Sequence, residues 1–286
     1  MTTPTESTPV AFAGDWHGNT EWAQRCVDYL DEQGDVRTLI HLGDFGFMGS
    51  IAAYLDAVHH RAEEANINIF VVPGNHENYD WIESQSIDSN GLIHITNRIH
   101  AYPRGHRFHI NGVSFCAVGG AVSVDKRHRT TGKSWWPQEE LTDSETETIR
   151  QQDRVEVLLT HDAPYGANTP KLPQQDFIRW VGAHIAQQSE EHQRRIRKIC
   201  DALQPRILIH GHYHFRYSDN HIWKAATGFP YAITIEGLDC DETISRTRYA
   251  GMPMPAVSDN LIVADIAENQ LTIRKEFEVA PSRGPA

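Results

Sequence analysis

The sequence predicts a single α/β domain built as a layered β-sandwich flanked by helices. Strand-like and helix-like segments alternate through the first half of the chain, an order that is typical of a parallel sheet with helices on its faces. A hairpin signal in the middle and strand-like runs near the end add further sheet. The length of 286 residues suits one large domain with a substantial buried core.

The first half is interpreted as strand, helix, strand, helix, strand. Its first helix has Asn19 as N-cap, apolar residues at three- and four-residue steps, and Gly34 at its end. The third strand is ended by Pro73-Gly74. The expected strands are 9–14, 38–42 and 67–72, and the expected helices are 19–34 and 51–65.

The second half opens with a hairpin around Asn111-Gly112, a strong two-residue turn signal. A polar, irregular stretch follows over 123–137, and the charge run 190–198 is interpreted as a solvated helix face. The last hairpin turns at Glu268-Asn269. The expected strands are 106–110, 113–118, 155–159, 206–209, 232–235, 261–266 and 271–277, with helix within about 140–152 and over most of 177–203.

The composition argues against a secreted protein, a membrane-spanning protein and a protein that binds long nucleic acid. Residues 1–9 lack the pattern of a secretory signal and are expected to be a flexible tail before a domain spanning 10–280. No apolar run approaches the length of a membrane span. The four scattered cysteines form no Cys-x-x-Cys pair, which favours reduced thiols and a cytoplasmic location. The net charge of -12 argues against binding long nucleic acid, and the oligomeric state stays open.

Polar residues follow five of the apolar runs. Since ligands collect at the carboxyl ends of strands in an α/β sheet, these residues are expected to converge in space. Carboxylates, imidazoles and amide oxygens suit Mn, Fe or Zn, and two such ions side by side indicate phosphate-ester chemistry. The five groups are Asp15-Trp16-His17, Gly43-Asp44, Gly74-Asn75-His76-Glu77, His161-Asp162 and Gly211-His212-Tyr213-His214.

Each residue taken alone has a simpler interpretation. Asp15, Asp44 and Asn75 could be turn residues, and His161 could be a buried structural histidine. Together these interpretations require seven coincidences in the right order, which favours the metal site. Outside the pattern, His210 is interpreted as a structural residue or as a support for a neighbouring ligand, and not as a ligand itself. Asp162 either supports His161 by a hydrogen bond or makes a local turn.

In order and spacing, these groups resemble the signature of the calcineurin-like metallophosphoesterases over roughly residues 15–214. The resemblance implies their α/β/β/α architecture and a centre of two divalent metal ions. It also implies the ligands. Asp44 would bridge the two ions, one of which would be held by Asp15, His17 and His214 and the other by Asn75, His161 and His212.

The resemblance further implies a hydrolase acting on small phosphoesters, as a phosphomonoesterase or phosphodiesterase. A hydroxide bridging the metals would attack phosphorus, and His76 would bind the phosphate and assist the leaving group. Glu77 either orients His76 or packs locally. The alternatives are a nuclease or cyclic-nucleotide phosphodiesterase and, from another class, a non-catalytic metal-binding scaffold. The presence of every signature residue weighs against the scaffold.

The segment from Gly119-Gly120 to Trp135-Trp136 is similar to a stretch in a bacterial and phage-type subgroup of this family. Arg129 could grip a substrate phosphate through its fork of donors, or could be an ordinary surface arginine. The two tryptophans could line the mouth of the site, pack in the core or form a dimer contact.

Overall fold

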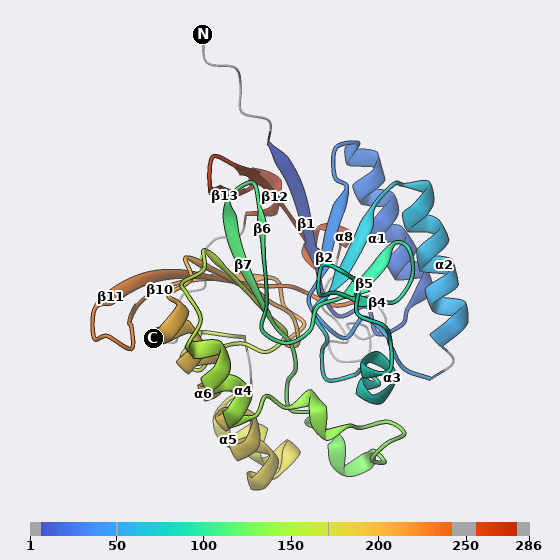
Figure 1. Ribbon diagram of the computed structural model, residues 1–286. Coiled ribbons are helices and arrows are strands. Elements are labelled where there is room, and N and C mark those ends of the chain that lie inside the picture. The colour runs from blue at the N-terminus through green and yellow to red at the C-terminus, as the bar shows by residue number, and fades with distance from the viewer. Residues whose placement is uncertain (1–6, 50, 171, 242–255, 279–286) are drawn as a thin grey trace.

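The computed structural model describes residues 7–49, 51–170, 172–241 and 256–278. Its strands form two mixed sheets that pack against each other, with helices on the outer faces (Figure 1). The strand order is β13-β12-β1-β2-β3-β5-β4 in the first sheet and β10-β11-β9-β8-β7-β6 in the second.

The first sheet has a parallel centre. β1, β2, β3 and β5 run parallel, while β12 pairs antiparallel with β1 and places Ile262 opposite Phe12. β13 and β4 close the two edges as antiparallel strands. The bounds are β1 (Thr8–Ala13), β2 (Thr38–His41), β3 (Asn68–Val71), β4 (Ile93–His94), β5 (Ile99–Ala101), β12 (Leu261–Ala267) and β13 (Gln270–Ile273).

The second sheet follows the same plan. Its centre consists of four parallel strands in the order β7, β8, β9 and β11, and the antiparallel strands β6 and β10 form its edges. The bounds are β6 (His106–Ile110), β7 (Val113–Val118), β8 (Val157–Thr160), β9 (Ile207–His210), β10 (Tyr217–Lys224) and β11 (Pro230–Gly237).

Helices cover the outer face of each sheet. In Figure 1, α1 and α2 lie beside the first sheet, and α4 and α6 lie on the opposite side of the molecule. The described helices are α1 (Thr20–Gln33), α2 (Ile51–Glu64), α3 (Tyr79–Glu83), α4 (Asp143–Arg150), α5 (Gln174–Val181), α6 (Ala183–Leu203) and α8 (Val257–Asn260), with 3-10 turns at Lys126–His128, Pro137–Glu139 and Lys275–Phe277.

Successive side chains of a strand point to opposite faces of its sheet, and this alternation produces the layers. Val10 and Phe12 of β1 join the core between the two sheets, while Ala11 and Ala13 join the core beneath α1 and α2. A third core packs the outer face of the second sheet against α6, where Ile196 is fully buried. The chain therefore forms helix, sheet, sheet and helix layers, which confirms the predicted fold class.

The predicted elements match closely in the first half. The Asn19 side chain accepts a hydrogen bond from the Trp22 N–H at the start of α1, and Gly34 ends that helix with φ 78°. β1 begins at Thr8, inside the expected tail. Residues 1–6 and 279–286 lie outside the described residues, so the limits of the tail and the domain stay predictions.

Three differences have physical causes. β10 was not predicted because Ser218, Asp219, Asn220 and His221 make it polar, and its pairing with β11 supplies the strand instead. The expected long helix divides into α5 and α6 at Gly182, where φ is 89°. The last strand is shorter than expected, because a 3-10 turn follows β13.

Candidate metal centre

The carboxyl ends of five strands meet at one edge of the paired sheets. Asp15 follows β1, Asp44 follows β2, Asn75 follows β3, His161 follows β8, and His212 follows β9. The structure therefore brings together all the predicted ligand residues, which lie up to about two hundred positions apart in sequence.

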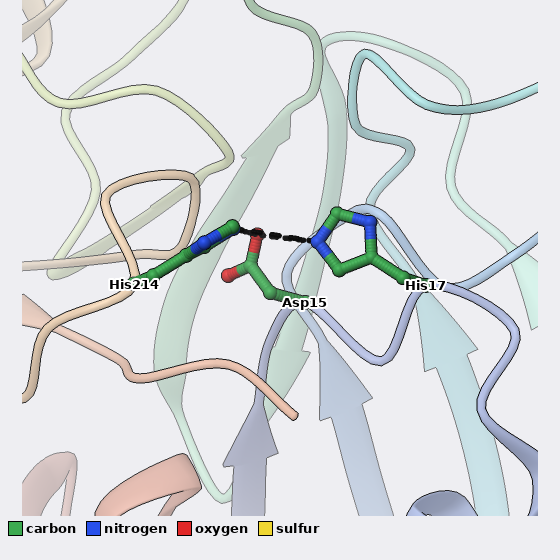
Figure 2. A group of neighbouring side chains, drawn as sticks. All are labelled: Asp15, His17 and His214. Atoms are coloured by element: carbon green, nitrogen blue, oxygen red, sulfur yellow. Dashed lines mark hydrogen bonds and ion pairs between the residues drawn. The ribbon is translucent and has the colours of Figure 1, made fainter. Parts of the chain in front are cut away.

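One cluster contains Asp15, His17 and His214, whose candidate ligand atoms all lie within 4.8 Å of one another. Figure 2 shows the two imidazole rings approaching the Asp15 carboxylate from opposite sides. The Nε2 atom of His214 lies 3.3 Å from Asp15 Oδ1, and that of His17 lies 4.0 Å away. The two Nε2 atoms are 3.3 Å apart.

The second cluster contains Asp44, His161 and His212, again within 4.8 Å. His161 Nε2 lies 3.4 Å from Asp44 Oδ1 and 3.0 Å from Asn75 Oδ1. The other ring nitrogen of His161, Nδ1, donates to the Leu42 carbonyl at 2.6 Å. Such a bond orients the ring and leaves Nε2 facing Asp44 and Asn75, as in metal-ligating histidines.

Asp44 faces both clusters. Its Oδ1 atom lies near His161, and its Oδ2 atom lies 3.8 Å from His17 Nε2. A third group of atoms within 4.8 Å joins Asp44 with His17 and His76. The two oxygens of one carboxylate thus point toward different histidine clusters, which is the arrangement that a bridging ligand requires.

The backbone at the candidate ligands is unusual. Of the ten described non-glycine residues with positive φ, five are candidate ligands, and this left-handed backbone costs about 1–3 kcal/mol for each residue. Adjacent glycines let the loops approach: a Cβ at Gly43 would overlap the His161 ring, and one at Gly211 would overlap the Asp15 carboxylate. The five residues are Asp15, His17, Asp44, His212 and His214.

The buried charges favour a cation at this place. Burial raises the pKa of Asp15 to about 7. Burial acts to raise the pKa of Asp44 as well, but His161 and His76 draw it well below its usual range. Burial acts to lower the pKa of His161, yet the nearby Asp44 and Asp15 carboxylates and the bond to the Leu42 carbonyl together raise it to about 10. The site thus offers buried carboxylate, imidazole and amide groups as ligands, and its carboxylates favour a positive charge between them. Such a site fits divalent metal ions.

His76 and Arg129 lie together beside the clusters. The backbone N–H of His76 donates to Asp44 Oδ1 at 2.7 Å. Burial lowers the pKa of the His76 ring. Arg129 Nη2 lies 2.7 and 2.6 Å from the Nδ1 and Nε2 atoms of His76, and 2.9 Å from Asp125 Oδ1. With 8% of its side chain exposed, Arg129 is not an ordinary surface arginine.

The tryptophans have structural contacts. Trp136 is 4% exposed and donates from Nε1 to Asp80 Oδ2 at 2.9 Å, which ties its loop to α3. The Lys126 ammonium lies 5.5 Å from the centre of the Trp135 ring. Neither tryptophan lines the cavity of about 230 Å³ beside the metal clusters, whose walls are His17, Gly18, Gly46, Met48, Ile51, Tyr54 and His76.

Glu77 supports the loop that follows Asp44. Its buried carboxylate accepts the N–H of Phe45 at 2.7 Å and that of Phe47 at 2.8 Å. Of the two roles expected for Glu77, these contacts favour local packing over orientation of His76. His210 is structural, as predicted, because its ring nitrogens contact the Gly211 carbonyl and the Tyr217 hydroxyl.

Asp162 supports the His212–His214 loop instead of His161. It accepts the Ala163 N–H at 2.8 Å, the turn contact that was one of the two expectations. It also accepts the Tyr213 hydroxyl at 3.1 Å and His192 Nδ1 at 2.8 Å. The run 190–198, expected to be a solvated face, therefore has a buried side, where His192 and Ile196 are 0% exposed and Gln193 is 8% exposed.

A family model described as calcineurin-like phosphoesterase matches residues 8–216, most of the chain. The chain belongs to the calcineurin-like phosphoesterase family. This confirms the resemblance carried by the strand-end residues, while the bacterial and phage-type subgroup stays a prediction. No curated protein sequence matches the chain significantly.

Solved structures agree with the fold of this calcineurin-like phosphoesterase. The protein TT1561 of Thermus thermophilus is 9% identical with a TM-score of 0.51, covering 95% of this chain and 100% of its own. A dimetal phosphatase from Danio rerio is 14% identical with a TM-score of 0.51, covering 94% of this chain and 96% of its own. At these identities the likeness establishes the fold alone.

Family membership and the clustered histidines and aspartates identify a metal-dependent phosphoester hydrolase. In the part of the chain that the structure describes, no helix combines the length and apolar character needed to cross a membrane. The cytoplasmic location stays a prediction from the cysteines.

Proposed function

We propose that this calcineurin-like phosphoesterase hydrolyses small phosphoesters at a centre of two divalent metal ions. The supporting observation is the position of Asp44, whose two carboxylate oxygens face separate clusters. The Danio rerio protein with this fold is a dimetal phosphatase, which is consistent with a pair of ions here. The ligands would be Asp15, His17 and His214 for one ion, Asn75, His161 and His212 for the other, and Asp44 for both.

Two such ions, when bound, supply an activated nucleophile and neutralise charge on the phosphoryl oxygens. Mn, Fe and Zn suit the nitrogen and oxygen donors of this chain. Substrate binding and proton delivery depend on the chain's own side chains. The Asp44 carboxylate fixes the backbone of His76 beside both clusters, so that its ring can reach a phosphate held there.

His76 is proposed to hydrogen-bond the substrate phosphate and, as the imidazolium, to deliver its proton to the departing oxygen. The negative charge of a bound phosphate would favour that charged form, against the lowering effect of burial and of Arg129 on the pKa of the ring. Its ring centre lies 5.1 Å from that of His17, close to the first cluster. Arg129 is proposed to donate to a phosphoryl oxygen, since a guanidinium forms strong charge-assisted bonds with phosphate. Asp125, 2.9 Å from Arg129, would keep the guanidinium in place.

The leaving group is proposed to occupy the cavity of about 230 Å³ bounded by His17 and His76. Among the residues that the structure describes, its walls include Met48, Ile51 and Tyr54 and carry no carboxylate, lysine or arginine. A small leaving group without charge fits such walls better than a polynucleotide does. This agrees with the acidic net charge of the chain.

A substrate panel after metal removal tests the proposal. The protein would be stripped with a chelator, reloaded with Mn²⁺ and assayed on p-nitrophenyl phosphate, bis-p-nitrophenyl phosphate, cyclic nucleotides and RNA, with Asp44→Asn as control. Metal-dependent hydrolysis of a nitrophenyl ester, absent in the variant, is the expected result. Hydrolysis of RNA in preference to every small ester would favour the nuclease alternative. Bound metal without hydrolysis of any ester would favour a scaffold.

A further inference from the structure

A buried chain of hydrogen bonds lies behind Asn75. Asn75 Nδ2 lies 3.1 Å from Ser123 Oγ, and Ser123 Oγ lies 2.9 Å from Glu139 Oε2. The Ser123 N–H donates to Glu139 Oε1 at 2.8 Å. The three residues are 3%, 0% and 1% exposed, so water does not compete for these bonds. Glu139 was absent from the residues singled out in the sequence.

When Glu139 is ionised, the donors and acceptors of this chain of hydrogen bonds have one direction. An ionised carboxylate only accepts, and both Glu139 oxygens already receive bonds from Ser123. The hydroxyl hydrogen of Ser123 is best placed on Glu139 Oε2 at 2.9 Å, because its other acceptor, the backbone carbonyl of Asn75, is farther away at 3.5 Å. The lone pairs of Oγ then face the Asn75 amide. Asn75 must present its NH₂ group to Ser123, so its Oδ1 atom points the other way, to 3.0 Å from His161 Nε2.

We infer that Ser123 and Glu139 are positioning residues that turn the amide oxygen of Asn75 toward the metal centre. The two ends of an asparagine amide have nearly the same shape, but only the oxygen can bind a cation. An amide rotated by half a turn would present hydrogens to the metal. The inference rests on the proposed role of Asn75 as a ligand.

The local backbone is built to hold this arrangement. The Gly120 N–H donates to the Pro73 carbonyl at 2.8 Å, directly before Gly74-Asn75. A Cβ at Gly119 would overlap that same carbonyl, and one at Gly120 would overlap the carbonyl of Glu139. The double glycine of the sequence thus lets the Ser123 segment pack against both Pro73 and Glu139.

Arg104 binds the backbone on both sides of the Ser123–Glu139 contact. Its guanidinium donates to the Gly119 carbonyl at 3.2 Å and to the Gln138 carbonyl at 2.8 Å, next to Glu139. It also pairs with Glu145 at 2.7 Å. One partly buried cation therefore bridges the backbone near Ser123 and the backbone near Glu139.

The charge of Glu139 matters to the direction of the bonds. Burial raises the pKa of Glu139 to about 8, against the lowering effect of the two Ser123 donors. Cations bound at the neighbouring centre would favour the carboxylate further, since opposite charges nearby favour the ionised form. A neutral acid could donate to Ser123 and release its hydroxyl hydrogen. Glu139→Gln imitates that form.

The test is a cycle of metal titrations at a pH above the pKa of Glu139. Mn²⁺ affinity is measured for the whole protein and for Glu139→Gln and Ser123→Ala. Each is expected to weaken the binding of one ion by about 10–100-fold, the range for groups that orient a ligand. The thermal midpoint of the metal-free forms is recorded alongside, because a variant that only loosens the fold would lower it.

The matched control is Asn75→Asp, whose two carboxylate oxygens are equivalent and need no orientation. In that background Glu139→Gln is expected to change Mn²⁺ affinity by less than about threefold, within the error of additivity. Equal losses in both backgrounds would overturn the positioning role, and so would unchanged affinity of Glu139→Gln and Ser123→Ala. If Asn75→Ala also kept full affinity, the proposed ligand set itself would be wrong.

Discussion

The two clusters at the strand ends are held in different ways. His161 is fully buried, and a bond from Nδ1 to the Leu42 carbonyl orients its ring. His17 keeps 14% of its side chain exposed and is placed by its backbone, whose N–H donates to the Asp44 carbonyl at 2.7 Å. The His161 ring is therefore set by a side-chain hydrogen bond in the interior, and the His17 ring by the conformation of its loop.

This difference leads us to expect different roles for the two clusters, one in metal retention and the other in substrate contact. The cavity next to the centre is bounded by His17 and His76 and not by His161 or Asn75. We therefore expect the cluster around His161 to retain its ion more tightly, because the His161 ring is already oriented by its bond to the Leu42 carbonyl. The cluster around His17 would face the substrate.

Asp44→Asn should have the largest effect, because Asp44 is the residue that faces both clusters. The variant keeps the shape of the side chain but loses the charge shared between them. We expect hydrolysis of p-nitrophenyl phosphate to fall below detection and the bound metal, measured by atomic emission, to fall below two ions per chain. Full activity in this variant would remove the basis for a shared ligand.

His76→Ala should lower kcat by about 10²–10⁴-fold, the contribution usual for a positioned acid or base. Metal content should stay at the wild-type level, because His76 is proposed to act on the substrate. A leaving group of low pKa, such as p-nitrophenol, should be affected less than an alkyl one. A variant with normal kcat on an alkyl phosphate would exclude proton delivery by His76.

His161→Ala and His17→Ala form a matched pair, one from each cluster. We expect at least about 100-fold weaker binding of the tighter ion in His161→Ala, beyond the range for removal of an orienting group. His17→Ala should weaken mainly the second, looser ion. Stepwise Mn²⁺ titration separates the two events. The comparison fails if His17→Ala abolishes the tighter event while His161→Ala spares it.

Arg129→Lys should reduce kcat/KM by roughly tenfold, because a lysine keeps the charge but loses the forked donors. Asp125→Asn, which removes the partner of Arg129, should act in the same direction and less strongly. Neither substitution should change metal affinity. Steady-state kinetics with a Mn²⁺ titration measure both quantities, and an unchanged kcat/KM in Arg129→Ala would assign this arginine to structure alone.

Glu77→Gln should cost about 1–3 kcal/mol in the free energy of unfolding, since one buried N–H of the loop after Asp44 would lose its acceptor. Urea denaturation measures this cost. Activity at saturating Mn²⁺ should change less than in the variants above. Normal stability would show that the Phe45–Phe47 loop holds its conformation without this carboxylate.

The sequence predicted the strand-end residues because each follows an apolar run and shares the geometry of a parallel sheet. Asp15, Asp44 and His161 could be assigned to one edge without any side-chain detail. β10 escaped prediction because its polar residues are held by pairing with β11. The Ser123–Glu139 bond also escaped, since a contact across sixteen positions of irregular backbone has no periodicity that a sequence pattern can reveal.

A crystal structure of the Mn²⁺-loaded protein, with anomalous scattering to locate the metal, tests the central claim most directly. We predict two ions that both contact Asp44, one with Asp15, His17 and His214 and the other with Asn75, His161 and His212. A single ion, or strong binding only at the more exposed group His59, His60 and Glu63, would contradict the proposed two-metal centre.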